Sequence, residues 1–169
     1  MQRRSILKWI AAAPLGVAFS PALLAMPQTP LWRTLAAVQQ HLLPGGEGAP
    51  SAVEVGAVEY LYMTMRHVSF DFEIRDFIFL GAQWAEQESQ GVFGRSFDAL
   101  GEAERERICR ILQNEYAQGE AWLSTLISYT LEAFLGDPIY GCNGDGIGWK
   151  WLGHVPGLPR PKRRFVHDV

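Results

Sequence analysis

The residue types best suited to chemistry gather near the C-terminus, in residues 136–150. This segment holds Asp137, Cys142 and Asp145, together with five of the chain's 17 glycines. That glycine content indicates a backbone that needs positive φ angles or close approach. Two carboxylates can serve as general acid and base, but an Asp before proline and an Asp between glycines are also typical turn formers. We interpret Asp137 and Asp145 primarily as turn residues, with acid–base chemistry as the alternative.

The same segment does not match the common ligand-binding loops. With Asn143 and Asp145 at positions 3 and 5 of a calcium loop, positions 1 and 12 are Gly141 and Leu152, which lack the required carboxylates. The glycine spacing differs from that of a dinucleotide-binding loop. The four histidines are far apart in the sequence, without the i, i+4 pair of a zinc-binding helix, and there is no C-x-x-C-H haem motif. We therefore expect no cofactor or metal site in this chain.

Two cysteines are too few for a disulfide scaffold or a four-cysteine cluster. Cys109 falls at the edge of an apolar helical stripe, which is typical of a buried thiol. Cys142 lies among glycines, where we expect it to be accessible. An internal Cys109–Cys142 disulfide, a bridge from Cys142 to another subunit and a free thiol all remain open, because sequence does not determine connectivity.

The residues before the glycine-rich segment are predicted to form helices. Residues 70–74 alternate like a strand, but no second alternating run exists to pair with them. The last predicted helix has an apolar stripe wider than one face requires, so we expect it to be central or shared with a partner. Apolar residues at helical spacing predict helices over residues 31–43, 51–67, 71–90, 102–116 and 120–135.

The second of these helices has a recognisable start. Ser51 followed by Glu54 is the pattern of a capping box. Its buried side is predicted to consist of Val53, Ala57, Tyr60, Leu61 and Met65.

Length and composition set the outer limits. The chain has 169 residues, 48% hydrophobic and 20% charged, which is typical of one globular domain. A pI of about 5.8 argues against a nucleic-acid-binding protein. The six tryptophans indicate a large buried apolar surface, within the domain or against another protein. We predict an all-α single domain of about five helices over residues 26–135, with a Gly- and Trp-rich irregular segment and basic tail over residues 136–169.

The N-terminal residues 1–25 are typical of an export signal, with three basic residues, no acidic one and a short apolar run. Arg3 and Arg4, followed by apolar residues and Lys8, resemble the twin-arginine signal. The apolar run contains Pro14 and Gly16 and is shorter than the ~20 residues of a spanning helix. An uncleaved membrane anchor or a chance basic start is the alternative. Twin-arginine export generally serves proteins that fold before export, commonly around a cofactor. Either the cofactor site of this chain is unrecognisable, or the cofactor belongs to a partner exported with it.

The stretch from Leu135 to Lys150, with Gly153 and Pro156-Gly157 after it, resembles the closing motif of the gluconate 2-dehydrogenase subunit 3 family. The resemblance covers residues 31–161. At Cys142 the sequence departs from the family's usual second glycine, which favours a special local role or a disulfide there.

The resemblance implies a non-catalytic small subunit of a periplasmic, membrane-associated dehydrogenase complex. In such complexes a glucose-methanol-choline-type flavoprotein containing FAD oxidises a sugar or sugar acid, and a multi-haem cytochrome c carries the electrons onward. The small subunit is expected to supply the twin-arginine signal and to support maturation of the flavoprotein. The sequence does not reveal which sugar or polyol is oxidised, nor the stoichiometry.

On this interpretation the C-terminal segment contacts the partner, with Trp and Tyr as anchors. A loop folded over its own helices is the competing interpretation. Two other classes remain: an export chaperone that leaves after delivery, and a stand-alone enzyme using Asp137 and Asp145. The predicted partner-facing residues are Tyr140, Gly141, Cys142, Asn143, Asp145 and Trp149.

Overall fold

The computed structural model describes residues 27–162 and confirms the predicted all-α class. The twin-arginine motif and the end of the basic tail lie outside the described residues. Within them there are six α-helices, one more than the five predicted, and three short 3-10 helices. The α-helices are α1 (Pro30–Leu42), α2 (Ala57–Met65), α3 (Phe72–Phe93), α4 (Glu102–Glu115), α5 (Gly119–Leu135) and α6 (Ile147–Leu152), and the 3-10 helices are η1 (Phe97–Ala99), η2 (Pro138–Tyr140) and η3 (Gly144–Gly146).

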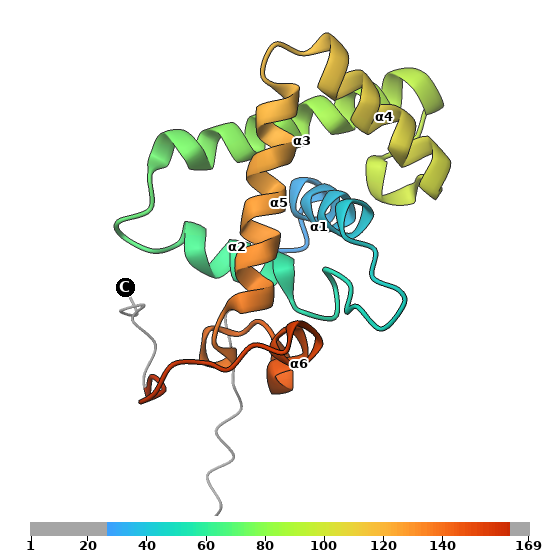
Figure 1. Ribbon diagram of the computed structural model, residues 1–169. Coiled ribbons are helices and arrows are strands. Elements are labelled where there is room, and N and C mark those ends of the chain that lie inside the picture. Colours follow the sequence, from blue (N-terminus) through green and yellow to red (C-terminus); the bar gives the residue numbers. More distant parts are fainter. Residues whose placement is uncertain (1–26, 163–169) are drawn as a thin grey trace, which may run out of the picture.

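Helix α5 is the central element of the fold. It contacts α1, α2, α3, α4 and α6, and Figure 1 shows it crossing the middle of the molecule. Helices α3 and α4 lie toward its N-terminal end, and α6 lies at its C-terminal end (Figure 1). The apolar stripe of α5 is wide partly because helices pack on several sides of α5 and bury Trp122, Leu126 and Phe134.

Helix α3 approaches α5 closely at one residue. Trp122 of α5 is fully buried, and its indole N–H donates to the Ile78 carbonyl of α3 at 3.0 Å. A Cβ atom on Gly81 would overlap that indole ring. Glycine is therefore required there, because any side chain would push the two helices apart.

Two of the predicted helix boundaries are wrong, and in both cases a glycine with a positive φ angle sets the observed boundary. The Ser51–Glu54 capping box forms, with the Ser51 N–H donating to Glu54 Oε2 at 2.7 Å. It closes only an isolated turn, however, because Gly56 adopts φ +71° and α2 begins after it. Val53, predicted to be buried, is 64% exposed on that turn. Similarly, the helix predicted over residues 71–90 continues to Phe93, where Gly94 caps it in the left-handed conformation.

The remaining buried residues of the second helix are as predicted. Ala57, Leu61 and Met65 are buried, and Tyr60 is half-buried. Helix α3 begins at Phe72, within the short alternating run of residues 70–74, and Asp71 caps it by accepting from the Glu73 N–H at 2.7 Å. The rejection of a strand there is confirmed.

Candidate functional site

The segment that carries the family resemblance folds into a compact structure at the end of α5, here called the C-terminal lobe (residues 136–160). Asn143 lies at its centre, fully buried and in the left-handed conformation with φ 49°. Its backbone N–H donates to the Val55 carbonyl at 2.7 Å, which ties the lobe to the turn before α2. Its own carbonyl accepts from the Gly146 N–H at 2.8 Å. The lobe is therefore organised around a buried polar residue.

The side chain of Asn143 joins the two ends of the lobe. Its Nδ2 donates to the Gly136 carbonyl at 3.0 Å, and its Oδ1 accepts from the Gly148 N–H at 2.7 Å. Gly148 is in turn packed so tightly that a Cβ would overlap the Phe134 carbonyl of α5. One amide thus pairs with a part-buried acceptor after α5 and with a buried donor in α6, where unpaired groups would be costly.

The other end of the lobe is fastened by Trp149 and Arg160. Trp149 is 8% exposed, and its indole N–H donates to the Leu135 carbonyl at 2.8 Å. The Arg160 guanidinium lies 5.0 Å from the Trp149 ring and makes two 3.0 Å hydrogen bonds to the Asp137 carboxylate. The C-terminal segment is thereby held against the start of the lobe.

Asp137 acts as a capping and pairing residue in this arrangement. Its Oδ1 accepts from the Ile139 N–H at 3.0 Å, which confirms the predicted turn role. The hydrogen bonds from Arg160 lower the pKa of Asp137, with desolvation opposing them. A general acid needs a raised pKa near neutrality, so Asp137 is unsuited to that role. Asp145 is exposed, in a left-handed turn with φ 53°.

The two cysteines are free thiols, so the internal disulfide considered from the sequence is not formed. They belong to separate clusters: Cys109 packs in the helical bundle, whereas Cys142 packs beside Phe134 in the lobe. Burial raises the pKa of Cys142 to about 11 and that of Cys109 to about 12. Cys142 is only 2% exposed, contrary to the accessible thiol expected in a glycine-rich loop.

The six predicted partner-facing residues divide into two groups. Cys142, Asn143 and Trp149 are buried inside the chain and hold the lobe together. Gly141 and Asp145 are exposed, and Tyr140 is half-buried. Any contact that a partner makes with the buried three would therefore be indirect, through the surface that they support.

Helices α5 and α6 carry exposed apolar residues that the sequence analysis did not identify as a possible binding surface. Ile127, Leu131 and Leu135 follow one another at four-residue intervals along the side of α5 turned away from the core. Their exposed fractions are 36%, 46% and 52%. Trp151 and Leu152 of α6 are each 49% exposed, and the centroid of the Trp151 ring lies 6.1 Å from that of the buried Phe134 ring of α5. We call these five residues the outer stripe.

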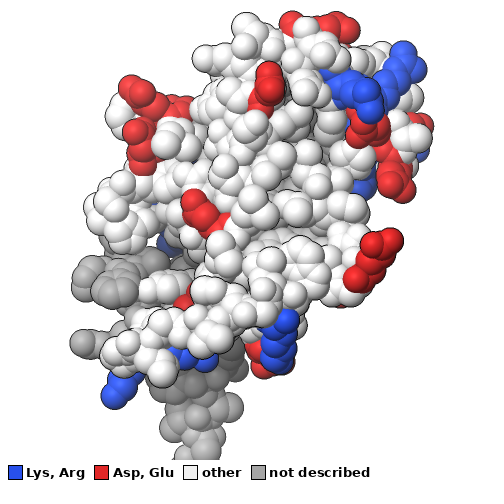
Figure 2. Space-filling view, viewed as in Figure 1, with Lys and Arg blue, Asp and Glu red and all other residues white. Residues whose placement is uncertain are grey.

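Helix α5 crosses the front of the molecule in the view of Figure 1, from which Figure 2 is also seen. Figure 2 shows that the middle of this face is mostly uncharged, with scattered acidic side chains, while Lys and Arg lie toward its edges. The sequence signal for the outer stripe was the unusual width of the apolar pattern in residues 120–135. Spacing alone did not separate its buried members from its exposed ones.

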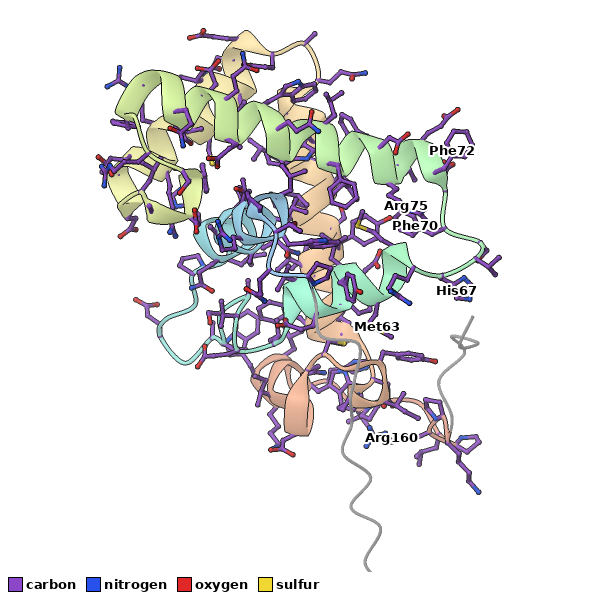
Figure 3. The ribbon with its side chains drawn as sticks, turned by 180° about the vertical axis from the view of Figure 1, so that it is seen from behind. Met63, His67, Phe70, Phe72, Arg75 and Arg160 are labelled. Atoms are coloured by element: carbon purple, nitrogen blue, oxygen red, sulfur yellow. The ribbon has the colours of Figure 1, made fainter. Side chains whose placement is uncertain are left out.

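The opposite side of the molecule has a different character. Figure 3 shows Met63, His67, Phe70, Phe72 and Arg75 around the connection between α2 and α3. Arg75 Nη2 donates to the Met65 carbonyl at 2.7 Å, and its guanidinium lies 5.9 Å from the Phe70 ring. Apolar groups here are interleaved with charged ones.

Two kinds of feature are absent from residues 27–162. No group of three or more His, Cys, Asp or Glu side chains in this range is arranged to hold a metal ion. No helix in the same range combines the length and the hydrophobicity required to cross a membrane.

Comparison with known proteins gives one family match. The model of the family described as gluconate 2-dehydrogenase subunit 3 matches residues 30–157, from the start of α1 into the C-terminal lobe. No curated protein and no solved structure matched the chain. The family match covers most of the sequence and contains both the helical bundle and the Asn143-centred lobe. The chain therefore belongs to the gluconate 2-dehydrogenase subunit 3 family.

Proposed function

We propose that this chain is the non-catalytic small subunit of a periplasmic, membrane-associated dehydrogenase complex that oxidises a sugar or sugar acid. Its role is to bring the flavoprotein catalytic subunit through twin-arginine export and to support its maturation and stability. In this proposal a glucose-methanol-choline-type flavoprotein contains the FAD, and a multi-haem cytochrome c passes the electrons on.

The family match over residues 30–157 carries this proposal, since the family is described as a subunit of gluconate 2-dehydrogenase. Arg3 and Arg4 add the expectation of an export route that serves folded proteins. Together they explain why a signal for folded, cofactor-containing proteins stands on a chain in which we identify no cofactor motif.

The C-terminal lobe fits a supporting role better than a cofactor site. Both the donor and the acceptor of the Asn143 amide are used within the chain. Asp137 is likewise engaged by Arg160 and by the Ile139 N–H. A buried cofactor would need polar groups that are free to bind it, whereas these are occupied in holding the lobe to α5.

The export role is tested by replacing Arg3 and Arg4 with lysine and following the flavoprotein rather than this chain. The double variant keeps the positive charge but removes the arginine pair, so periplasmic flavoprotein and its dye-reducing activity should fall at least about tenfold. Lys8→Arg is the matched control and should leave both at the level of the original chain. An unchanged flavoprotein level in the double variant would show that export is not shared.

A second measurement distinguishes a resident subunit from an export chaperone that leaves. The active complex is purified from membranes through a tag on the flavoprotein, and this chain is sought in it. A stoichiometric amount supports the subunit role, whereas its absence from an active complex supports the chaperone.

A further inference from the structure

The last described residues, 150–162, form an exposed edge at the end of the C-terminal lobe, here called the terminal strip. In Figure 1 the terminal strip runs from α6 along the lower end of the molecule. All of its residues except two prolines are exposed. Val155 and Leu158 are 83% and 85% exposed, and Trp151 and Leu152 are each 49% exposed. The strip therefore presents large apolar side chains to solvent along its length.

The terminal strip is fastened to the lobe near both ends. At one end the buried Trp149 donates its indole N–H to the Leu135 carbonyl, and its own carbonyl accepts from the His154 N–H at 2.8 Å. At the other end Arg160 binds the Asp137 carboxylate. The chain between these two points is thus held against the lobe with its apolar side chains exposed.

The charge of the terminal strip is positive. Residues 146–162 contain Lys150, Arg160 and Lys162 and no Asp or Glu. Both lysines are exposed, and Figure 2 shows Lys and Arg side chains at this lower end of the molecule, with an acidic side chain beside them. Asp145 is exposed just before α6, so the positive charge increases along the strip from Lys150 toward Lys162.

The acidic residues nearest in sequence do not cancel this charge. Asp137 is bonded to Arg160, and Glu132 of α5 accepts from the Tyr60 hydroxyl at 3.0 Å. The sequence continues with Arg163 and Arg164, which lie outside the described residues. An apolar edge with this charge is complementary to a surface that is apolar beneath a layer of negative charge.

The order of residues in the terminal strip distinguishes a lipid surface from a protein partner. It reads Lys-Trp-Leu-Gly-His-Val-Pro-Gly-Leu-Pro-Arg-Pro-Lys, so glycine, proline and basic residues separate most of its apolar side chains. Protein interfaces pack closely around anchors that fill pockets, whereas a fluid lipid surface accommodates separate side chains. The three prolines also lack the backbone N–H that is costly to bring near hydrocarbon without a partner.

The connection between α2 and α3 is equally exposed but has the opposite charge. Val68 is 85% exposed and Phe72 is 68% exposed. The cations on either side are engaged within the chain, because Arg66 donates to the Tyr62 hydroxyl and Arg75 to the Met65 carbonyl. The carboxylates of this connection and of the first turns of α3 are exposed, namely Asp71, Glu73 and Asp76. This connection is therefore a control with similar apolar exposure and no affinity for anionic lipid.

We propose that the terminal strip contacts the surface of a membrane that contains anionic lipid. Trp151, Val155 and Leu158 enter the boundary between headgroups and hydrocarbon, and the two lysines pair with lipid phosphates. Exposed apolar side chains, a tryptophan and cations in one segment are the combination that binds such surfaces. The inference rests on the proposed function only in that the complex lies at a membrane.

The test places one environment-sensitive fluorophore at either of two matched positions. Leu158→Cys and Val68→Cys, both at sites 85% exposed, are labelled in the full chain with the two native cysteines replaced by alanine. The probe is a vesicle of phosphatidylcholine and phosphatidylglycerol in equal parts. Emission from position 158 should rise and shift to the blue, because the label leaves water, whereas emission from position 68 should not change. Vesicles of phosphatidylcholine alone should give little response at either position.

Charge variants measure the contribution of the lysines. Lys150→Gln and Lys162→Gln should each raise the lipid concentration for half-maximal response at position 158 about fivefold, since a cation at an anionic surface contributes about that factor. Arg110→Gln removes an equally exposed cation from α4 and should leave that concentration unchanged. Residues 1–25 are the same in every variant, so any lipid binding by them contributes equally. High salt should abolish the effect of the lysines.

Three outcomes would overturn the inference. The label at position 158 is silent, both labels respond alike, or the lysine variants bind vesicles normally but release another subunit from the purified complex, which would show that the strip contacts a protein. Circular dichroism establishes that each variant is folded, and vesicle sedimentation of the lysine variants with native cysteines repeats the comparison without a label. Failure of the chain to co-purify with the flavoprotein would instead remove the proposed function and leave the vesicle result standing.

Discussion

One hydrophobic cluster lies inside the helical bundle, and a second lies where the C-terminal lobe meets the end of α5 and the residues around the start of α2. The bundle cluster is built from large side chains of α1 to α5 and η1, with Trp122, Leu126 and Phe97 among its fully buried members. The second cluster, here called the lobe cluster, has mainly small buried residues around Phe134, namely Ala52, Val55, Ala57, Ala133 and Cys142. Cys142 is its buried member from the lobe, and the partly buried Tyr140 and Ile147 of the lobe pack against it. Small side chains remove little apolar surface from water, so the lobe needs another source of order.

That source is a set of hydrogen bonds: those of Asn143, the one from Trp149 to the Leu135 carbonyl, and those from Arg160 to Asp137. Directional bonds position the lobe against the end of α5 even though its apolar cluster is small. The bundle is therefore stabilised mainly by the packing of large buried side chains, whereas the lobe is stabilised mainly by a few polar contacts. Loss of one contact should therefore open the lobe locally without unfolding the bundle.

The largest expected effect is in the bundle. Trp122→Ala leaves a cavity beside Gly81 and removes the hydrogen bond to the Ile78 carbonyl. It should lower the free energy of unfolding by ~3–5 kcal/mol, measured by denaturant or thermal unfolding. Trp151→Ala, at a half-exposed tryptophan of the outer stripe, should cost less than ~1 kcal/mol. A similar decrease in the free energy of unfolding in both variants would contradict the role of Trp122 as a principal core residue of the bundle.

The next effect is in the lobe. Asn143→Gly keeps a residue that tolerates the positive φ but removes both side-chain hydrogen bonds, leaving the Gly148 N–H and the Gly136 carbonyl unpaired. The lobe should open more easily by roughly 2–4 kcal/mol. Hydrogen exchange should accelerate in residues 144–152 and stay unchanged in residues 78–90 of α3.

A second glycine variant provides the control. Asp145 shares the positive φ but is exposed, so Asp145→Gly should leave exchange in the lobe unchanged or slightly slower. If Asn143→Gly accelerated exchange in α3 as much as in the lobe, the two parts would form one cooperative unit and the comparison would be wrong.

Thiol reactivity gives a smaller and more local measure. The raised pKa values of Cys142 and Cys109 make both thiols slow to react in the folded protein near pH 8. With each cysteine kept alone by replacing the other with alanine, Cys142 should react faster, through opening of the lobe. Asn143→Gly should accelerate Cys142 about tenfold or more and leave Cys109 unchanged. Equal rates for the two cysteines in a Cys-reactive dye assay would refute separate opening.

The smallest effect concerns the pair of Asp137 and Arg160. Because Arg160 lowers the pKa of Asp137 below the usual 3.8, the pair stabilises the fold above about pH 4, and this stabilisation is lost as the pH falls through the lowered pKa. Arg160→Gln should cost less than ~1 kcal/mol at pH 7. The difference from the original chain should disappear in acid.

The pH dependence of that variant has a matched control in the bundle. Arg110 forms a more exposed i, i+4 pair with Glu106 on α4, and Arg110→Gln should change stability by less than Arg160→Gln at every pH. A larger effect at Arg110 would show that the Asp137–Arg160 pair stabilises the protein no more than an exposed ion pair on a helix surface.

Much of the fold was predictable because helical periodicity is a local property. The five predicted helices are all present, since apolar residues three and four apart mark the buried side of each. The Ser51–Glu54 box and the turn role of Asp137 were also local and are confirmed. The extent of the second helix was wrong because the positive φ of Gly56, which interrupts it, depends on how the preceding turn meets the C-terminal lobe.

The candidate site was less predictable because it depends on contacts between distant residues. The glycine-rich segment was correctly singled out, yet the burial of Cys142, Asn143 and Trp149 follows from hydrogen bonds to Val55, Gly136 and Leu135, which residue types do not reveal. Likewise, the width of the α5 stripe was visible, but its division into core and outer stripe was not.

By itself, the sequence determined the helical class, the positions of most helices, the basic N-terminus and the motif that indicates the family. These depend on spacing and composition along the chain. Only the tertiary structure decided that Asn143 faces inward while Leu131 faces outward. The reason is that the exposure of a residue on a central helix depends on which neighbours pack around it. That packing leaves one side of α5 uncovered.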